Sequence, residues 1–387
     1  MDLTSQKHLF TLDSNIHYLN CAYKAPLLKT AETAAIDELI SLRTPSSLKP
    51  DDFFNDAEEV RALFAEIVGS ASQNIAIIPS TTYGFSSVLN NIKGKKDGHA
   101  ITVVDEFPSG YFSLKRWCEE NENALRVVGP NEEADSRGQS WNENLLAAID
   151  HQTSIVLISS VHWTNGTVFD LEAIGGKCKE VGATFVVDGT QSVGVMEMDV
   201  NKFNIDALVC ASYKWLFGPY SIALAHIGES FSQGRPLEEG WMNRLNARKF
   251  SELTDYEETY SPGAGRYNVG QNSNLILMPM LKISLQQLLE WEPKRIEAYC
   301  NELIKPLLTY LTECGVELES KKYFSSHLFS LRLPSAFNTD RLQEIFETKK
   351  IVVSLRGADI RVSLNVFNDE NDIHQLIEAI HLSRSIS

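Results

Sequence analysis

Short apolar runs alternate with amphipathic stretches from residue 56 to residue 225, and this alternation constrains the fold more than any other feature. The runs expected to be strands are Ile75–Ile78, Ala100–Val104, Arg126–Val128, Ile155–Ser159, Thr184–Val187, Ala207–Ala211 and Ile222–Ala225. The expected helices include Asp56–Ile67, Tyr83–Asn91, Ser113–Glu120, Asn142–Ala148 and Leu171–Val181. Strands that alternate with helices form a mostly parallel sheet covered on both faces. The sequence therefore predicts an α/β fold with a mostly parallel seven-stranded sheet.

The pattern changes beyond residue 230, where strands and helices no longer alternate regularly. The helices expected there are Leu275–Trp291, Ile296–Cys314, Thr339–Lys349 and Asp369–Ser383, with Pro293 either interrupting the first or starting the next. The expected strands are His327–Leu333, Ile351–Ser354 and Ile360–Leu364, and Asn15–Leu19 is a further short strand. Because 387 residues exceed one comfortable core, we expect two domains. Residues 18–260 form the large one, and residues 1–17 with 261–387 form a smaller α+β domain.

Composition narrows the class of protein. The net charge of −16 argues against a nucleic-acid partner, and no apolar stretch is long enough for a membrane span. Six cysteines are scattered without metal-ligand or disulfide spacing, so no metal site is expected. The first residues lack the basic and apolar segments of a signal peptide. These observations favour a cytoplasmic protein.

A carboxylate and a lysine follow two neighbouring strands. Asp188 ends the run Thr184–Val187, and Lys214 comes shortly after the run Ala207–Ala211. Ligands of α/β sheets bind beyond the carboxyl ends of the strands, so both side chains are expected at the site. Pyridoxal phosphate needs such a pair: the lysine forms a Schiff base with its aldehyde, and the acid keeps its pyridine nitrogen protonated.

The segments Asp188-Gly189-Thr190-Gln191-Ser192 and Ser212-Tyr213-Lys214-Trp215-Leu216-Phe217-Gly218-Pro219 resemble the class V aminotransferases, a branch of the fold-type I pyridoxal-phosphate enzymes. That group includes cysteine desulfurases, kynureninase and isopenicillin N epimerase. The resemblance spans about residue 17 to residue 380. It implies a large cofactor-binding domain, a smaller C-terminal domain and a homodimer whose active sites lie at the subunit interface.

The resemblance implies a role for each residue around the cofactor. Lys214 forms the Schiff base and later carries the substrate α-proton, and Asp188 holds the pyridine nitrogen. Gln191 bonds the phenolic oxygen, Phe107 stacks on the ring, and the phosphate is held by Thr81, Thr82, Ser109 and Tyr213. Hydroxyls and backbone N–H groups at a helix N-terminus also form an anion site on physical grounds.

The same resemblance implies a substrate pocket for a small amino acid. Arg361 matches the arginine that binds the α-carboxylate, which suits its planar guanidinium fork, and Arg356 helps to shape the pocket. His162 follows the strand Ile155–Ser159, and Tyr23 lies in a segment that lines the entrance. Gln271 replaces a threonine that contacts the partner's phosphate in relatives, so that contact is in doubt. Candidate contributors from a partner subunit are Arg244, Arg248 and Arg266.

Most of these residues also have a purely structural interpretation. Asp188 could cap a helix, and Lys214 could be an exposed lysine at a strand end. Phe107 could pack in the core, His162 could be a buried structural histidine, and Arg361 could form a surface ion pair. Only the arrangement of these side chains in space decides between the two interpretations.

The shared chemistry is an external aldimine followed by an α-carbanion, from which several reactions diverge. We expect a class V aminotransferase, and the alternatives are a kynureninase-like or C–S lyase reaction and an isopenicillin N epimerase-like racemisation. Residues 351 to 361 contain no cysteine, which argues against a desulfurase that carries a persulfide there. A catalytically silent binding protein of the same fold is the alternative from another class.

Overall fold

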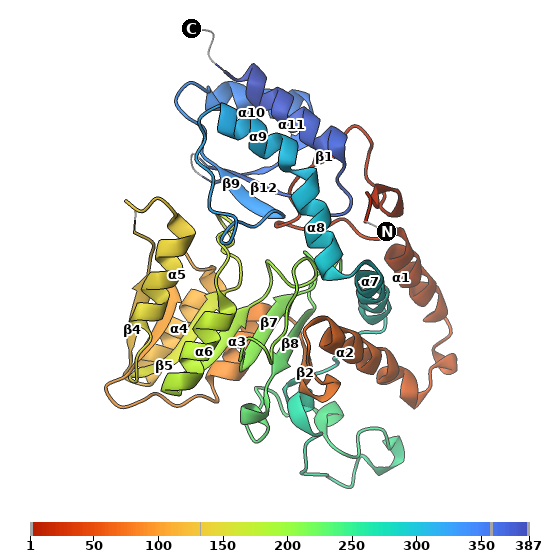
Figure 1. Cartoon of the computed structure of the whole chain (residues 1–387). Coiled ribbons are helices and arrows are strands. Elements are labelled where there is room, and N and C mark those ends of the chain that lie inside the picture. The colour runs from red at the N-terminus through yellow and green to blue at the C-terminus, as the bar shows by residue number, and fades with distance from the viewer. Residues whose placement is uncertain (1–2, 132, 357–358, 385–387) are drawn as a thin grey trace.

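The computed structural model describes residues 3–131, 133–356 and 359–384, and its centre is a seven-stranded sheet (Figure 1). The strands in chain order are β2 (Ile75–Ile78), β3 (His99–Val103), β4 (Ala124–Val128), β5 (Thr153–Ser159), β6 (Thr184–Asp188), β7 (Ala207–Ala211) and β8 (Ala223–Ile227). Their order across the sheet is β2-β8-β7-β6-β5-β3-β4. Only β8 runs antiparallel to its neighbours β2 and β7. The predicted α/β class and mostly parallel seven-stranded sheet are confirmed.

Helices cover both faces of this sheet. They are α2 (Asn55–Ile67), α3 (Thr81–Leu89), α4 (Pro108–Glu120), α5 (Arg137–Ala148) and α6 (Leu171–Val181). Successive strand residues point to opposite faces, so Val186 belongs to one hydrophobic cluster and Val187 to the other. Burial on both faces explains why central strands such as β7 are continuous apolar runs in the sequence, whereas β4 is largely exposed.

A second, antiparallel sheet lies at the upper end of the molecule in Figure 1. Its strands, in the order β11-β12-β9, are β9 (Leu328–Leu331), β11 (Ser354–Arg356) and β12 (Asp359–Ser363). The helices of this region are α8 (Pro293–Leu303), α9 (Lys305–Glu313), α10 (Thr339–Thr348) and α11 (Glu370–Leu382). Near the N-terminus, β1 (His17–Tyr18) pairs in parallel with β10 (Ile351–Val352). The N-terminal segment therefore joins elements from the C-terminal part of the chain.

Helices α1 (Lys29–Ser41) and α7 (Leu277–Trp291) pack against each other beside the large sheet, and α8 leads from α7 to the upper sheet (Figure 1). Short 3-10 helices connect the longer elements: η1 (Lys7–Leu9), η2 (Pro45–Ser47), η3 (Pro50–Phe53), η4 (Ser72–Asn74), η5 (Glu229–Phe231), η6 (Trp241–Asn243), η7 (Phe250–Glu252) and η8 (Gly263–Tyr267). The expected division into residues 18–260 and residues 1–17 with 261–387 stays a prediction.

Three differences from the expected elements are larger than a shift of an element's ends. The helix expected at Ile296–Cys314 is broken into α8 and α9, because Pro306 has no N–H to continue the ladder and begins a new helix instead. The strand expected at Ile351–Ser354 is divided between two sheets. Helix α1 was not predicted. Ala31 is its one buried residue, so its sequence lacks the apolar stripe that marks an amphipathic helix.

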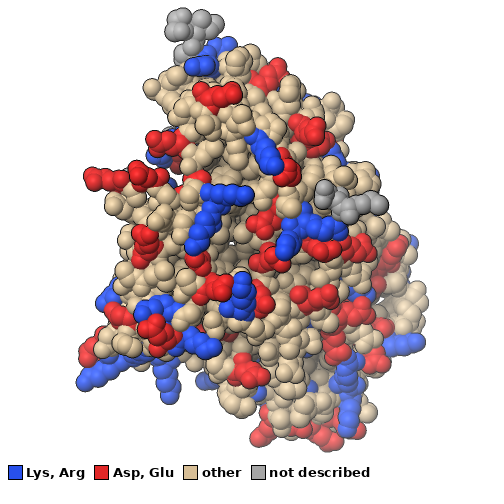
Figure 2. All heavy atoms as spheres, viewed as in Figure 1, with Lys and Arg blue, Asp and Glu red and all other residues tan. Residues whose placement is uncertain are grey.

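Acidic and basic side chains are interspersed over the face shown in Figure 2, and no basic patch dominates it. Among the described residues, none of the helices has the length and apolar character required to cross a bilayer.

Candidate active site

Asp188 and Lys214 lie together at the carboxyl ends of the parallel strands. Asp188 is the last residue of β6, and Lys214 sits in the turn that follows β7. Both side chains are buried, with 5% and 7% of their surface exposed. They line a small hollow of about 20 Å³, together with Thr81, Phe107, Ser159, Trp163, Thr190, Gln191, Ala211 and Tyr213. This is the edge of the sheet at which ligands of α/β proteins bind.

A larger hollow, of about 660 Å³, lies at the amino-terminal ends of the parallel strands. His226 and Asp206 line it. His226 is engaged with the Ser70 hydroxyl at 2.7 Å, and Asp206 accepts a hydrogen bond from the backbone N–H of Phe185 at 2.8 Å. Because these groups already serve the fold, chemistry rather than size identifies the hollow at Lys214 as the candidate site.

Burial dominates the electrostatics of the pair. It raises the pKa of the Asp188 carboxyl, and the hydrogen bond from the Thr190 N–H at 2.9 Å opposes that rise. Burial likewise lowers the pKa of Lys214 to about 8, and the charge of Arg361 lowers it further while Asp188 opposes the change. An amine with this pKa is partly neutral near physiological pH, as a nucleophile must be.

We expect the reactivity of Lys214 toward an aldehyde to rise with pH until about pH 8. Only the neutral amine attacks a carbonyl, so below the pKa the rate should increase about tenfold per pH unit and then level off. Stopped-flow absorbance of the apoprotein mixed with pyridoxal phosphate measures this rate, with Lys214→Ala as the blank. A midpoint near the ordinary lysine value of 10.5 would show that the amine is solvated.

Two helix N-termini meet beside this pair and carry the predicted phosphate ligands. Ser80 caps α3 by accepting a hydrogen bond from the Tyr83 N–H at 3.2 Å, so Thr81 and Thr82 begin the first turn. The Thr82 hydroxyl donates to Ser109, in the first turn of α4, at 3.0 Å. Hydroxyls and N–H groups at helix N-termini favour an anion.

Phe107 lies on the wall of the hollow. The centre of its ring is 5.7 Å from the Lys214 ammonium nitrogen, and its ring meets that of Trp163 edge-to-face at 5.5 Å. Trp163 is held in turn by donating to the Asp105 carbonyl at 2.7 Å. An aromatic ring fixed in this way can support a planar ligand.

Glu106 is a buried residue that bonds Ser159 on the wall of the hollow, and the sequence analysis assigned it no role. Its carboxylate accepts hydrogen bonds from the backbone N–H groups of Ser159 and Phe107, each at 2.7 Å, and from the Ser159 hydroxyl. Burial raises its pKa to about 7, and the nearby Asp188 contributes to the rise. Since Ser159 pairs with Asp188 across β5 and β6, Glu106 links the ring wall to the strand that carries the acid.

Glu106→Gln should lower the free energy of unfolding by about 1–3 kcal/mol. The carboxylate accepts three hydrogen bonds, whereas one side of an amide can only donate and would leave a buried donor unsatisfied. Urea unfolding measures the change, and Glu120→Gln at the exposed end of α4 is the control. Equal stability of the two variants would contradict a bracing role.

Gln191 and Tyr213 flank the lysine. The Gln191 side-chain oxygen accepts from the indole N–H of Trp215 at 2.8 Å, while its nitrogen donates to the Ala22 carbonyl at a longer 3.4 Å. The Tyr213 ring centre is 5.7 Å from the Lys214 ammonium nitrogen and packs on Tyr220 at 4.8 Å. Both residues line the hollow, and their expected contacts with a cofactor stay a prediction.

The predicted substrate residues are only partly brought together. Arg361 lies on β12, is 2% exposed and donates to the Trp163 carbonyl at 2.8 Å. Tyr23 lies in the N-terminal segment and is 65% exposed. A hydrogen bond of 3.0 Å from the Ala25 N–H to the Tyr213 carbonyl fixes this segment beside the lysine turn.

His162 lies apart from the pocket, contrary to the functional expectation. Its ring is fully buried against Trp141, and its two nitrogens engage the Val104 carbonyl at 3.1 Å and the Thr164 hydroxyl at 2.9 Å. Burial lowers its pKa to about 4. The chain folds back at the bridge between Val161 and Val168, which turns this ring into the core. Arg356 ends β11, and its side chain lies outside what the structure describes.

The residues expected at a subunit interface are engaged within this chain. Arg244 pairs with Glu239 at 2.5 Å, and Arg248 pairs with Glu58 at 2.7 Å. Gln271 is exposed, with a φ of +60°.

The model of the family Aminotransferase class-V matches residues 49–376, which include every residue that lines the hollow. The chain belongs to the class-V aminotransferase family.

Two curated relatives illustrate the range of this family. An uncharacterized aminotransferase of Bacillus subtilis is 21% identical over 325 residues, which cover 84% of this chain and 82% of the relative. The kynureninase of Monosiga brevicollis is 24% identical over 359 residues, which cover 84% of this chain and 75% of the relative. The class-V fold is also that of the cysteine desulfurase from Thermococcus onnurineus, with a TM-score of 0.81, 18% identity and 98% of each chain covered.

Proposed function

We propose that this class-V chain is a pyridoxal-phosphate-dependent aminotransferase that acts on a small amino acid. The observation that carries the proposal is the buried pair of Lys214 and Asp188 at the carboxyl edge of the sheet. Arg361 lies close enough for its charge to lower the pKa of Lys214. The proposal assigns these three residues the roles of nucleophilic amine, acid and carboxylate receptor.

The residues fit the cofactor at each of its polar ends. In this proposal Lys214 forms the Schiff base, Asp188 holds the ring nitrogen and Phe107 supports the ring, which is consistent with their shared position at the hollow. The Gln191 amide nitrogen, held only by a long bond, is available to the phenolic oxygen. The phosphate suits the hydroxyls of Thr81, Thr82, Ser109 and Tyr213. When bound, pyridoxal phosphate supplies an electron-withdrawing ring that stabilises negative charge at the substrate α-carbon.

The remaining steps belong to the side chains of this chain. Arg361 binds the substrate carboxylate with its guanidinium fork, which orients the α-carbon. Lys214, with a pKa of about 8, can accept the α-proton and return it near neutral pH. Phe107 and Trp163 form an apolar wall that limits water at the reacting carbon.

The number of proton carriers favours transamination. Among the described residues that line the hollow, the titratable ones are Asp188, Tyr213 and Lys214, and the first two serve the ring nitrogen and the phosphate in this proposal. A single carrier can take a proton from one carbon and deliver it to another, whereas epimerisation needs a second donor on the opposite face.

A kynureninase-like or C–S lyase reaction shares the first steps and is the second candidate. A desulfurase reaction through a persulfide is not favoured. Burial raises the pKa of the Cys300 thiol, whereas a persulfide carrier needs a reactive thiolate.

Location and assembly are part of the same proposal. Six free thiols, five of them buried, suit a reducing compartment such as the cytoplasm. A homodimer is proposed because the class V resemblance places the active sites at a subunit interface. Tyr23 and Tyr220, 65% and 66% exposed beside the hollow, are surfaces that a second copy could cover.

A product assay tests the reaction. The purified protein with pyridoxal phosphate is mixed with each proteinogenic amino acid, with and without a 2-oxo acid, and products are separated by chiral chromatography. Transamination yields one new amino acid for each 2-oxo acid released. Products that form without an acceptor would indicate a lyase, a D-enantiomer would indicate an epimerase, and no turnover would favour the silent binding protein.

A further inference from the structure

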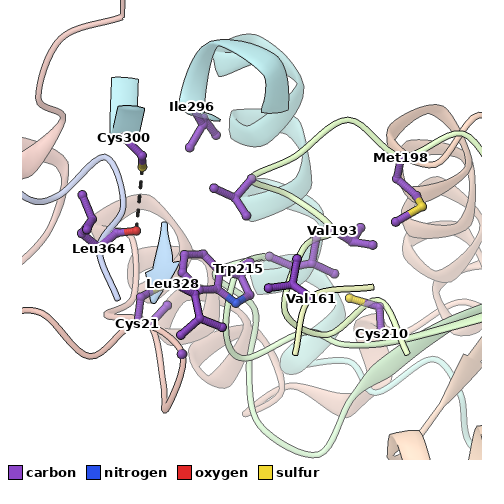
Figure 3. Close-up of a cluster of buried hydrophobic side chains, with 14 of the residues drawn as sticks. Cys21, Val161, Val193, Met198, Cys210, Trp215, Ile296, Cys300, Leu328 and Leu364 are labelled. Atoms are coloured by element: carbon purple, nitrogen blue, oxygen red, sulfur yellow. Dashed lines mark hydrogen bonds between the residues drawn. The ribbon is translucent and has the colours of Figure 1, made fainter. Parts of the chain in front are cut away.

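Trp215, the residue after the proposed Schiff-base lysine, lies between the two sheets. Its side chain is fully buried. Figure 3 shows it with Leu328 of β9 on one side and Val161 and Val193 on the other. A displacement of β9 would therefore move Trp215 and the adjacent turn that carries Lys214, because close-packed interiors transmit displacement.

His327, immediately before β9, contacts both this tryptophan and Gln191, which also bonds the tryptophan; these three residues are called the His327–Gln191–Trp215 bracket below. Its Nε2 atom lies 2.7 Å from the Gln191 carbonyl oxygen, and its ring meets the Trp215 ring edge-to-face at 4.5 Å. The Trp215 indole N–H donates to the Gln191 side-chain oxygen at 2.8 Å. Gln191 is thus gripped through both its backbone and its side chain, from two parts of the chain.

The hydrogen bonds also define the tautomer of His327. A carbonyl oxygen can only accept, so Nε2 carries the proton toward Gln191. The other nitrogen, Nδ1, is 3.0 Å from the Ser325 hydroxyl, which can donate to it. Burial lowers the pKa of His327 to about 4, so the ring stays neutral and this pattern persists at physiological pH.

We infer that His327 is a positioning residue that couples the carboxylate-binding sheet to the cofactor loops through Gln191 and Trp215. Arg361 pairs with Ser330 across β12 and β9, so the strand that begins beside His327 also carries the partner of Arg361. The bracket sets the distance between the substrate carboxylate receptor and the Lys214 turn. This inference rests on the proposed function, and it adds a residue to that site.

Two substitutions separate the donor from the ring. His327→Phe keeps an aromatic ring against Trp215 and loses the bond to Gln191, whereas His327→Gln can keep a donor near the position of Nε2. We expect His327→Phe to bind pyridoxal phosphate roughly tenfold more weakly, because the buried Gln191 carbonyl loses its partner. The pH midpoint of the colour change of the bound cofactor should also shift, since the proposed function assigns Gln191 to the phenolic oxygen. His327→Gln should restore most of the affinity.

His226→Phe is the matched control. Like His327, His226 is buried, bonds a serine and has a pKa lowered to about 4 by burial. It lies near the amino-terminal ends of the parallel strands, away from Lys214. If His327→Phe does not fold, Ser325→Ala releases Nδ1 without removing the ring and should act in the same direction by a smaller factor. Unchanged affinity and midpoint in the folded variants, or an equal change in His226→Phe, overturn the inference. Affinity is read without substrate, so a protein that transaminates nothing yet shows the difference would retract only the proposed reaction.

Discussion

Lys214→Ala should abolish the visible colour of the protein with pyridoxal phosphate and lower the turnover of its amino-acid substrate by about 10³- to 10⁴-fold. The substitution removes both the nucleophile for the aldehyde and the proposed proton carrier at the α-carbon. The fold should survive, because the lost amine is buried and its pKa is already lowered by that burial. Absorbance and the product assay measure the two effects, and circular dichroism checks the fold.

Two controls make this result specific to the amine at the site. Lys202→Ala removes an exposed lysine that pairs with Glu172 at 3.0 Å, and it should leave colour and turnover unchanged. Lys214→Arg keeps a positive charge and should be as inactive as the alanine variant, because a guanidinium stays protonated. Colour that persists in Lys214→Ala would mean that another amine holds the cofactor.

Asp188→Asn should lower turnover by about 10²- to 10³-fold while cofactor binding is largely retained. The amide oxygen can still accept the Thr190 N–H, so the strand end keeps its shape. It has no negative charge, however, and cannot hold a protonated ring nitrogen. The effect should therefore appear in kcat more than in KM, which steady-state kinetics can separate.

Asp206→Asn is the control for a buried aspartate. Asp206 accepts a hydrogen bond from Phe185 at the other edge of the sheet, and burial also raises the pKa of its carboxyl. Any loss of turnover shared by the two variants would reflect the fold rather than the ring nitrogen. A turnover of Asp188→Asn within a factor of two of the native protein would remove Asp188 from the catalytic machinery.

Local pattern was sufficient for the large sheet because most of its strands contain a short apolar run, even though the exposed strand β4 includes Arg126. Local pattern was insufficient at Pro306, where one predicted helix is divided into α8 and α9, and at Val353, where one predicted strand is divided into β10 and β11. His162 shows the same limit at the site. Its place after β5 predicted a pocket residue, yet the reversal that follows turns the ring against Trp141.

The residues without a predicted role act through partners that are distant in the sequence. Glu106 binds Ser159, 53 residues away, and His327 binds the Gln191 carbonyl, 136 residues away. Glu106 offered a usable signal, because a carboxylate stands directly before Phe107, which the sequence analysis assigned to the cofactor ring. His327 offered no signal of this kind, since a histidine before a strand has many ordinary roles.

The amino-acid sequence by itself determined the α/β architecture and the placement of Asp188 and Lys214 at strand ends, because strand periodicity and the residues that end each strand are local properties. Only the tertiary structure decided how deeply that pair is buried, and with it the lowered pKa of Lys214. It also decided which side chains converge on the pair, since packing joins segments that no local pattern relates. The physical reason is that desolvation and hydrogen-bond geometry depend on neighbours in space rather than neighbours in the chain.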